Sequence, residues 1–214
     1  MSVDFQASLL DPTNGEAALG ELGAHVQRTR LGRGAWVDVR PGWVSGSDDL
    51  FVRLVETVPW QAERRQMYDR VVDVPRLLSW YGERDALPDP VLDEARDALS
   101  EHYRPELGEP FRTAGLCYYR DGRDSVAWHG DRVNGRSKAG NMADTMVAIV
   151  SFGEARRLLL RPRNGGATLS LSLGHGDLLV MGGSCQRTWE HAIPKTARPV
   201  GPRISVQFRP RGVR

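Results

Sequence analysis

The stretch that decides the fold of this chain is Thr168-Leu-Ser-Leu-Ser-Leu-Gly-His-Gly-Asp-Leu-Leu-Val-Met181. Apolar and polar residues alternate from Thr168 to Leu173, which is typical of a strand with one buried face. The run Leu178–Met181 is wholly apolar and predicts a second, fully buried strand. Glycines on both sides of His175 separate the two runs, so the segment between them predicts a turn that joins neighbouring strands.

Short runs of the same kind recur on both sides of this unit. They are separated by glycine-containing turns and lie at Leu116–Tyr119, Thr145–Phe152, Arg157–Arg161 and Arg203–Phe208. So many short strands in about one hundred residues favour a β-sandwich or jelly roll. The stretch 163–166 predicts a hairpin turn. Residues 132–144 are longer than an ordinary connection, and they fit either a lid or a surface loop.

The first part of the chain mixes helices with short strands such as Ala35–Val39. Ser47-Asp48-Asp49 is typical of a helix start, and apolar residues follow at helical spacing up to Pro59. A second helix is predicted after Pro88-Asp89-Pro90. We therefore expect a mainly β protein with flanking helices (α+β), in which residues 1–110 form an N-terminal extension and residues 111–214 form the core of one compact unit.

The composition is that of an ordinary globular protein, with 40% hydrophobic and 26% charged residues. The sequence contains no run of about 18 apolar residues, so it predicts no membrane span. Residues 1–6 lack the basic start and apolar stretch of a signal peptide. Cys117 and Cys185 are the only cysteines, so the sequence predicts no disulfide framework and fits a cytoplasmic location.

The charge is unevenly spread along the chain. The net charge is only +2, but residues 155–214 hold eleven Lys or Arg against Asp177 and Glu190, which gives this third a balance of +9. A basic third is compatible with binding to a polyanion such as nucleic acid. The alternative is that some of these arginines bind a small anion while the others solvate strands.

The tripeptide His-Gly-Asp occurs twice, at residues 129–131 and at residues 175–177. Two histidines and one carboxylate can occupy one face of an octahedral iron(II) ion and leave three positions open, which is the arrangement of non-haem oxygenases. The second copy lies in the turn described above, where Asp177 is expected to bond turn backbone groups. The first copy precedes the long loop, a position that suits an open metal site. We therefore predict that His129 and Asp131 bind the metal.

His191 is the candidate for the third ligand, the alternative being a core histidine with satisfied ring nitrogens. The strand that follows it, 203–209, alternates so that its polar residues share one face; they are Arg203, Ser205, Gln207 and Arg209. If this face points inward, its arginines need an anionic partner, and a metal-bound dicarboxylate provides one through a bidentate, charge-assisted pair. If it points outward, the run is a surface strand.

These residues together resemble the AlkB family of iron(II)- and 2-oxoglutarate-dependent dioxygenases. The resemblance extends over roughly residues 56 to 210, and its parts come in the order that the family has. It is carried by Val74–Gly82, Leu116–Asp131, His175–Gly183, Trp189–Pro194 and the arginine strand. It implies a double-stranded β-helix (jelly roll) as the catalytic core, with a nucleotide-recognition region in the N-terminal extension.

The resemblance also implies the roles of the site residues. It places iron(II) on His129, Asp131 and His191, and the distal carboxylate of 2-oxoglutarate on Arg203 with Tyr119. Arg209 then lies at the metal-proximal end of the co-substrate, and Ser205 is a further co-substrate contact. The second His-Gly-Asp becomes a structural turn that is typical of the family.

Two positions depart from the family pattern. The family often has asparagine where Cys117 stands, and this bears on one co-substrate hydrogen bond. Many members have a carboxylate that contacts the target base shortly after the metal-binding aspartate, where this chain has Arg132 and Val133. The second departure bears on base preference and on repair activity itself.

The implied function is oxidative dealkylation of N-alkylated bases in nucleic acid, as in DNA repair, with O2 as oxidant and release of formaldehyde, succinate and CO2. The base must be flipped out of a duplex or lie in single-stranded DNA or RNA. Aromatic side chains stack on such bases, and the candidates are Tyr68, Trp80 and Tyr81, with Arg132 as a further substrate contact. We expect a monomer without a membrane partner.

Two other functions stay open at this point. The first is a 2-oxoglutarate dioxygenase that acts on a protein or a small molecule, which the missing carboxylate after Asp131 favours and the basic C-terminal third disfavours. The second is a non-catalytic binding module on a jelly roll, which predicts no dependence on metal.

Overall fold

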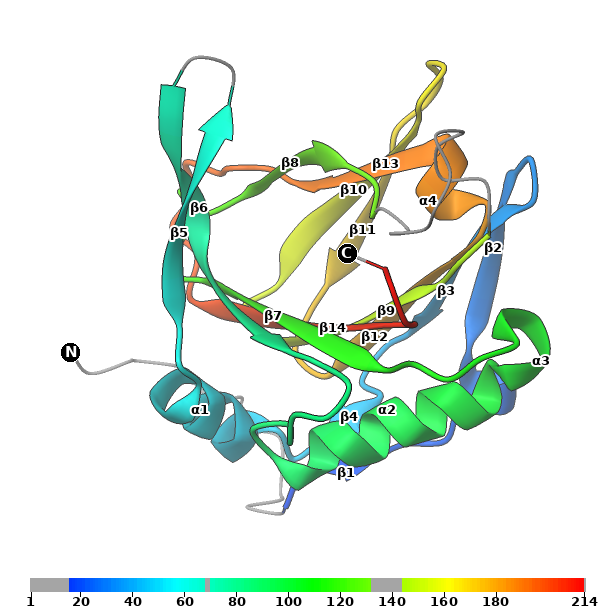
Figure 1. Ribbon diagram of the computed structural model, residues 1–214, viewed down its shortest axis with the longest axis horizontal. Coiled ribbons are helices and arrows are strands. Elements are labelled where there is room, and N and C mark those ends of the chain that lie inside the picture. Colours follow the sequence, from blue (N-terminus) through cyan, green and yellow to red (C-terminus); the bar gives the residue numbers. More distant parts are fainter. Residues whose placement is uncertain (1–15, 68–69, 132–143, 214) are drawn as a thin grey trace.

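The computed structural model describes residues 16–67, 70–131 and 144–213 of the chain. Two sheets face each other, and α1 (Asp48–Thr57) and α2 (Pro90–His102) cover the outer face of the larger one (Figure 1). The other helices are α3 (Arg104–Leu107) and α4 (Cys185–Thr188), with a 3-10 turn at Gly23–His25. Within the described ranges, no helix is long and apolar enough to cross a membrane.

The larger sheet has eight strands. In chain order they are β2 (Gln27–Gly32), β3 (Ala35–Arg40), β5 (Gln61–Met67), β6 (Arg70–Tyr81), β7 (Thr113–Tyr119), β9 (Val147–Gly153), β12 (Asp177–Gly183) and β14 (Arg203–Arg209). Their order across the sheet is β2-β3-β12-β9-β14-β7-β6-β5. Strands from both sides of residue 110 therefore share one sheet.

The smaller sheet has four strands. They are β8 (Val126–His129), β10 (Arg156–Pro162), β11 (Leu169–Leu173) and β13 (Trp189–Ile193), in the order β11-β10-β13-β8. From β7 onward the chain crosses back and forth between the two sheets, which is the jelly-roll topology that the sequence predicts. A further pair, β1 (Ala18–Leu19) and β4 (Val44–Ser45), lies apart from both sheets.

Both predicted helices are confirmed. Ser47 precedes α1, whose first turn carries Asp48 and Asp49, where negative charge favours the positive end of the helix dipole. Asp89 caps α2, because its side chain accepts a hydrogen bond from the backbone N–H of Val91 at 3.1 Å. Both helices turn apolar side chains onto the larger sheet, where they form one core cluster with that sheet's outer face.

The second core cluster lies between the two sheets. Alternation on β14 decides which residues face it, because Ile204, Val206 and Phe208 belong to the helix-side cluster. The polar residues of β14 therefore face the inside of the jelly roll, and Arg203 is only 1% exposed. The alternative of a surface strand is wrong, since the arginines of β14 point into the protein.

Candidate metal and co-substrate site

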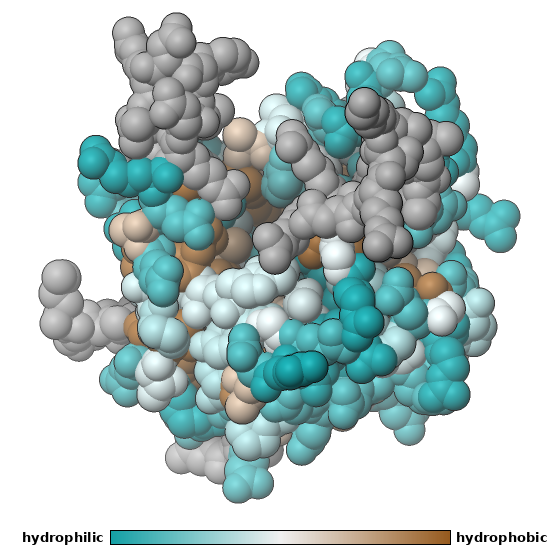
Figure 2. Space-filling view, viewed as in Figure 1, coloured by the Kyte–Doolittle hydropathy of each residue, from teal (hydrophilic) through white to brown (hydrophobic). Residues whose placement is uncertain are grey.

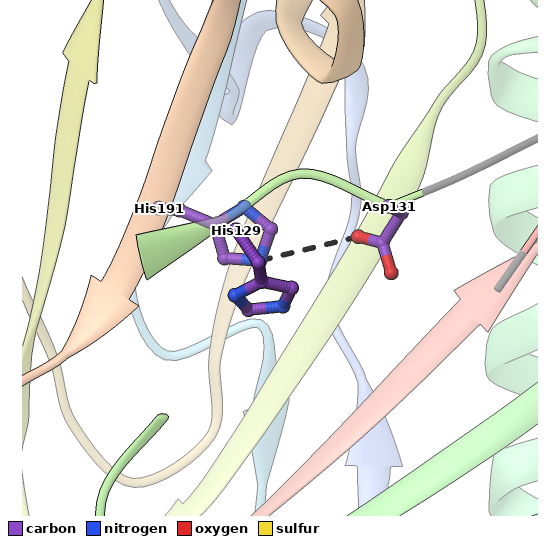
Figure 3. A group of neighbouring side chains, drawn as sticks. All are labelled: His129, Asp131 and His191. Atoms are coloured by element: carbon purple, nitrogen blue, oxygen red, sulfur yellow. Dashed lines mark ion pairs between the residues drawn. The ribbon is translucent and has the colours of Figure 1, made fainter. Parts of the chain in front are cut away.

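Strand pairing in the smaller sheet brings two histidines together. His129 ends the edge strand β8, and it lies directly opposite His191 of β13 in the register of the two strands. Their ring centroids are 4.2 Å apart. Asp131 follows β8 by two residues and turns back toward both rings, as Figure 3 shows. One ligand atom from each of the three side chains lies within 4.8 Å of the others, which is a spacing that one metal ion can span.

The protonation states suit metal binding. Burial and the neighbouring His129 lower the pKa of His191 to about 3, so its ring is neutral. The Nδ1 of His129 lies 2.8 Å from the carbonyl oxygen of Ala127, and a carbonyl can only accept, so Nδ1 carries the proton and Nε2 offers a lone pair. Burial alone would raise the pKa of Asp131, but the positive charge of Arg209 outweighs it, and the pKa lies below its usual value.

Arg209 and Gln186 hold Asp131 from two sides. Nε and Nη2 of Arg209 donate to Oδ1 of Asp131 at 3.1 and 3.0 Å. The other carboxylate oxygen, Oδ2, lies 3.9 Å from Nε2 of His191. The backbone N–H of Asp131 donates to Oε1 of Gln186, a buried residue of α4, at 2.9 Å. The loop that carries Asp131 is thus fixed to the segment that joins β12 to β13.

Gly130 lets this loop come close to α4. A Cβ atom at position 130 would lie 2.8 Å from the backbone oxygen of Gln186, which is closer than real contacts allow. We therefore expect Gly130→Ala to displace Asp131 and to weaken the affinity for Mn(II) by ~10- to 100-fold, the usual range for disturbing the support of a metal ligand. Metal titration by calorimetry measures this.

Gly201→Ala is the matched control, because a Cβ there meets Glu154 only at an ordinary 3.5 Å. Equal metal affinities for the two variants would contradict the role given to Gly130.

A small cavity of about 70 Å³ lies beside the three side chains, between the two sheets. Three arginines and one carboxylate line it, so with neutral histidines its described walls carry a net charge of +2; they are Arg76, Arg203, Arg209 and Asp131. Cys117, Tyr119, Ser205 and Gln207 line it as well. A cavity of this charge suits a dianion.

Arg203 is the most deeply buried of these cations. Its Nε donates to Oγ of Ser151 at 2.9 Å, and its guanidinium carbon lies 5.2 Å from the ring centre of Tyr119, the residue opposite it on β7. Its Nη1 is buried and finds no hydrogen-bond partner among the residues that the structure describes. Because burying an unpaired donor is costly, this atom points to an anionic ligand.

The second His-Gly-Asp forms the predicted turn. Asp177 accepts hydrogen bonds from the backbone N–H groups of Gly42 at 2.8 Å and Gly174 at 2.7 Å. His175 accepts one from the N–H of Gly153 at Nδ1, and its Nε2 lies 2.6 Å from Oγ of Ser47 beside α1. The prediction that Asp177 bonds turn backbone groups is confirmed.

The predicted substrate contacts are not all brought to this site. Trp80 lies on the cavity side of β6, is 45% exposed, and has its ring centre 5.9 Å from the guanidinium carbon of Arg209. Tyr81, the next residue, points to the other face and packs against the helix-side cluster. Tyr68, Arg132 and nearly all of the predicted lid lie outside the described residues.

An outer groove of about 520 Å³ runs along the edge strand β8 and reaches His129. Its lining is mostly apolar and includes Pro75, Trp128, Leu159 and Ile193, and Lys195 lines it as well. Figure 2 shows a largely polar face on which apolar surface gathers beside the hairpin of β5 and β6. The site therefore has a small charged cavity on its inner side and an apolar approach on its outer side.

Several residues of the site carry no signal that sequence reasoning used. Gln186 and Ser151 come from segments that look like an ordinary loop and an apolar strand. Arg76 lies inside the stretch Val74–Gly82 that the resemblance covers, but nothing in its spacing marks it as a lining residue. Alternation already places Gln207 on the polar face of the arginine strand, but the sequence predicts no role for it.

Comparison with known proteins identifies the superfamily of the chain. Residues 43–209 match the family model described as the 2OG-Fe(II) oxygenase superfamily. The chain belongs to this superfamily. Members use Fe(II), 2-oxoglutarate and O2, which agrees with the predicted cofactors.

Curated relatives lie within the AlkB branch of the superfamily. Alpha-ketoglutarate-dependent dioxygenase alkB homolog 3 of Bos taurus is 30% identical over 187 residues, which cover 79% of this chain and 64% of that protein. DNA oxidative demethylase ALKBH2 of Arabidopsis thaliana is 33% identical over 145 residues, 56% of this chain and 43% of that protein. The resemblance to the AlkB family is confirmed. The chain spans just under two thirds of the length of the bovine relative.

Solved structures of superfamily members share the fold. The structure of OsALKBH1 superposes with a TM-score of 0.56 and 14% identity, and covers 86% of this chain and 99% of its own. A 2OG-Fe(II) oxygenase from Burkholderia pseudomallei gives a TM-score of 0.54 and 14% identity, with 81% and 84% coverage. At this identity the likeness concerns the fold alone, and it agrees with the predicted jelly roll.

Proposed function

We propose that this protein is an oxidative dealkylase that removes alkyl groups from N-alkylated bases in nucleic acid. The observation that carries the proposal is that a His-Asp-His cluster lines a cationic cavity, and that an apolar groove reaches the same cluster at His129. Iron(II) with 2-oxoglutarate and O2 supplies the oxidation that hydroxylates an N-alkyl carbon, which then leaves the base as an aldehyde while 2-oxoglutarate becomes succinate and CO2.

His129, Asp131 and His191 would hold the iron in this function. Their donor set is the two-histidine, one-carboxylate set that non-haem iron(II) sites use. The neutral His191 ring and the protonated Nδ1 of His129 each leave a ring nitrogen to bind the ion. Asp131 keeps its negative charge at neutral pH because Arg209 lowers its pKa.

Arg203 would hold 2-oxoglutarate, with Tyr119 and Ser205 beside it and Arg209 nearer the metal. The +2 charge of the cavity balances a dicarboxylate, and the buried Nη1 of Arg203 provides a donor for it. Burial also raises the pKa of Tyr119 to about 12, so its hydroxyl stays protonated and can donate. These residues orient the co-substrate and keep water away from it.

The acceptor would be an alkylated base in single-stranded DNA or RNA, or a base flipped from a duplex, since a stacked base cannot reach the cluster. The outer groove reaches His129, and Lys195 in its lining is exposed, so its ammonium group can contact a phosphate. Arg156, Arg203 and Arg209 are buried, so these three of the eleven basic residues after position 155 give no surface charge. Recognition therefore rests on the groove and on stacking more than on the basic third.

The test compares acceptors under one set of conditions. Formaldehyde release is measured with methylated single-stranded DNA, methylated RNA and a methylated histone peptide, each with and without iron. We expect release from a nucleic acid and none from the peptide. Release from the peptide alone would identify a protein oxygenase. Release that does not depend on iron would contradict both the nucleic-acid dealkylase and the protein oxygenase. Binding to the oligonucleotide should also weaken with salt, with a log–log slope of about −0.7 per phosphate contacted.

Trp80 gives a prediction on base stacking. We expect Trp80→Ala to weaken binding of a methylated single-stranded oligonucleotide by about 1–3 kcal/mol, because the half-exposed ring lies beside Arg209 on the cavity side of β6. Fluorescence anisotropy measures the affinity. Val52→Ala is the control, since Val52 is a similarly exposed apolar residue on α1.

Thermal unfolding of the same variants separates binding from stability. A tryptophan in the core would instead lose about 3–5 kcal/mol of folding free energy. Unchanged oligonucleotide affinity in Trp80→Ala would remove Trp80 from the binding surface.

A further inference from the structure

The side chain of Gln207 connects the two ends of the cavity. Its Nε2 donates to Oγ of Ser205 at 2.6 Å, and its Oε1 lies 3.3 Å from Nη2 of Arg209 and 3.7 Å from Sγ of Cys117. From these contacts we propose that Gln207 is a positioning residue for the co-substrate, which acts through Ser205 and Arg209. The inference deepens the proposed function and rests on it.

Hydrogen-bonding chemistry fixes the orientation of the Gln207 amide. A guanidinium group has donors only, so the atom facing Arg209 must be the amide oxygen. The amide nitrogen is then left to face Ser205, as observed. The reverse orientation would set two donors against each other at Arg209. The amide therefore has one orientation. Its oxygen accepts from Arg209, and its nitrogen donates to Ser205.

At one end, Gln207 directs the hydroxyl of Ser205. The Ser205 oxygen accepts from the amide, so its proton turns away from Gln207. Ser205 is only 2% exposed and lines the cavity between Ser151 and Cys117, its neighbours on the adjacent strands. An anion in the cavity could accept a hydrogen bond from this hydroxyl, as it could from the buried Nη1 of Arg203.

At the other end, Gln207 holds Arg209 against Asp131. Nη2 of Arg209 lies between Oδ1 of Asp131 at 3.0 Å and Oε1 of Gln207 at 3.3 Å, and Nη1 donates to the backbone oxygen of Gln207 at 3.4 Å. Gly115, opposite Gln207 on β7, leaves the room for this contact, since a Cβ there would lie 2.9 Å from Nη1 of Arg209 and 3.3 Å from Oε1 of Gln207.

The experiment measures 2-oxoglutarate binding by calorimetry with Mn(II) in place of iron, so that no turnover occurs. The variants are Gln207→Leu, which removes both ends of the amide at similar size, and Gln207→Glu, which keeps an acceptor for Arg209 but presents no donor to Ser205. We expect about a tenfold loss of affinity in Gln207→Leu, the scale of one net hydrogen bond. We expect a larger loss in Gln207→Glu, because the added negative charge also repels the dianion.

A double-mutant cycle with Ser205→Ala separates positioning from a general structural effect. If Gln207 acts through Ser205, its substitution costs less once the hydroxyl is gone, and the two losses do not add. Gln27→Leu on β2 is the matched control and should bind 2-oxoglutarate like the wild type, as Gln27 is exposed and far from the cavity. Melting curves confirm that each variant is folded.

Three results would overturn the inference. Wild-type affinity in both folded Gln207 variants would remove Gln207 from the site. Strictly additive losses in the cycle would show that it does not act through Ser205. If the wild-type protein itself binds no 2-oxoglutarate with Mn(II), then the proposed function fails, and this inference fails with it.

Discussion

His129→Ala is expected to abolish iron-dependent turnover of 2-oxoglutarate. The side chain supplies one of three donors in a cluster whose atoms lie within 4.8 Å of each other, and alanine offers no donor in its place. Two remaining ligands leave the ion weakly held and remove the fixed geometry that orients the co-substrate. Succinate formation and the metal content of the purified variant are the measurements.

His175→Ala is the matched control, because it removes the histidine of the other His-Gly-Asp. Its ring contacts the backbone of Gly153 and the hydroxyl of Ser47 near α1, far from the cluster in the fold. We expect a loss of stability on the order of 1–3 kcal/mol from the backbone N–H left without a partner, with turnover retained in the folded protein. The opposite pattern, with His175 essential and His129 dispensable, would transfer the metal to the second pair.

Arg203→Ala is expected to raise the apparent Michaelis constant for 2-oxoglutarate by ~10- to 100-fold. This is the scale of losing a charge-assisted hydrogen bond worth roughly 1.5–3 kcal/mol. Arg203 is 1% exposed, and its Nη1 is buried, so the ligand carboxylate has no solvent to replace the lost contact. Arg203→Lys should recover part of the loss only, since an ammonium cannot grip a carboxylate with two parallel bonds.

Arg157→Ala is the control for this prediction. Arg157 is exposed on β10, so its loss removes one positive charge from the protein without touching the cavity. Initial rates over a range of 2-oxoglutarate concentrations give the constants for all the variants. A Michaelis constant in Arg203→Ala equal to that of Arg157→Ala would exclude Arg203 as the co-substrate anchor.

Sequence alone predicts those parts of the fold in which local pattern and burial agree. The alternation along 203–209 and the apolar run 178–181 predict strands that the structure places within two residues of the expected limits. Ser47 and Asp89 mark the starts of the helices because their position before an apolar helical run has one local meaning. Two members of the His-Asp-His cluster are also predicted from the sequence. Because the second His-Gly-Asp is assigned to a turn, the first is left as the candidate metal site.

The remainder depends on contacts between segments that are distant in the sequence. Nothing local separates Trp80 from Tyr81, since only their register against Gly115 and Ala114 decides which ring faces the cavity. Gln186 supports Asp131 from 55 residues away, and no spacing rule connects the two. The strand β5 has too few apolar residues to be predicted from the sequence, and it forms through its pairing with β6.

The eight-stranded sheet has a consequence for truncated forms of this chain. On one flank β6 pairs with β7, and on the other β3 pairs with β12, so segments before residue 110 cover both sides of the jelly-roll half of the sheet. A fragment that begins near residue 111 would bare the backbone N–H and C=O groups of β7 and β12 along two long apolar edges. Such edges pair with strands from other molecules, so this fragment should aggregate more readily than the whole chain.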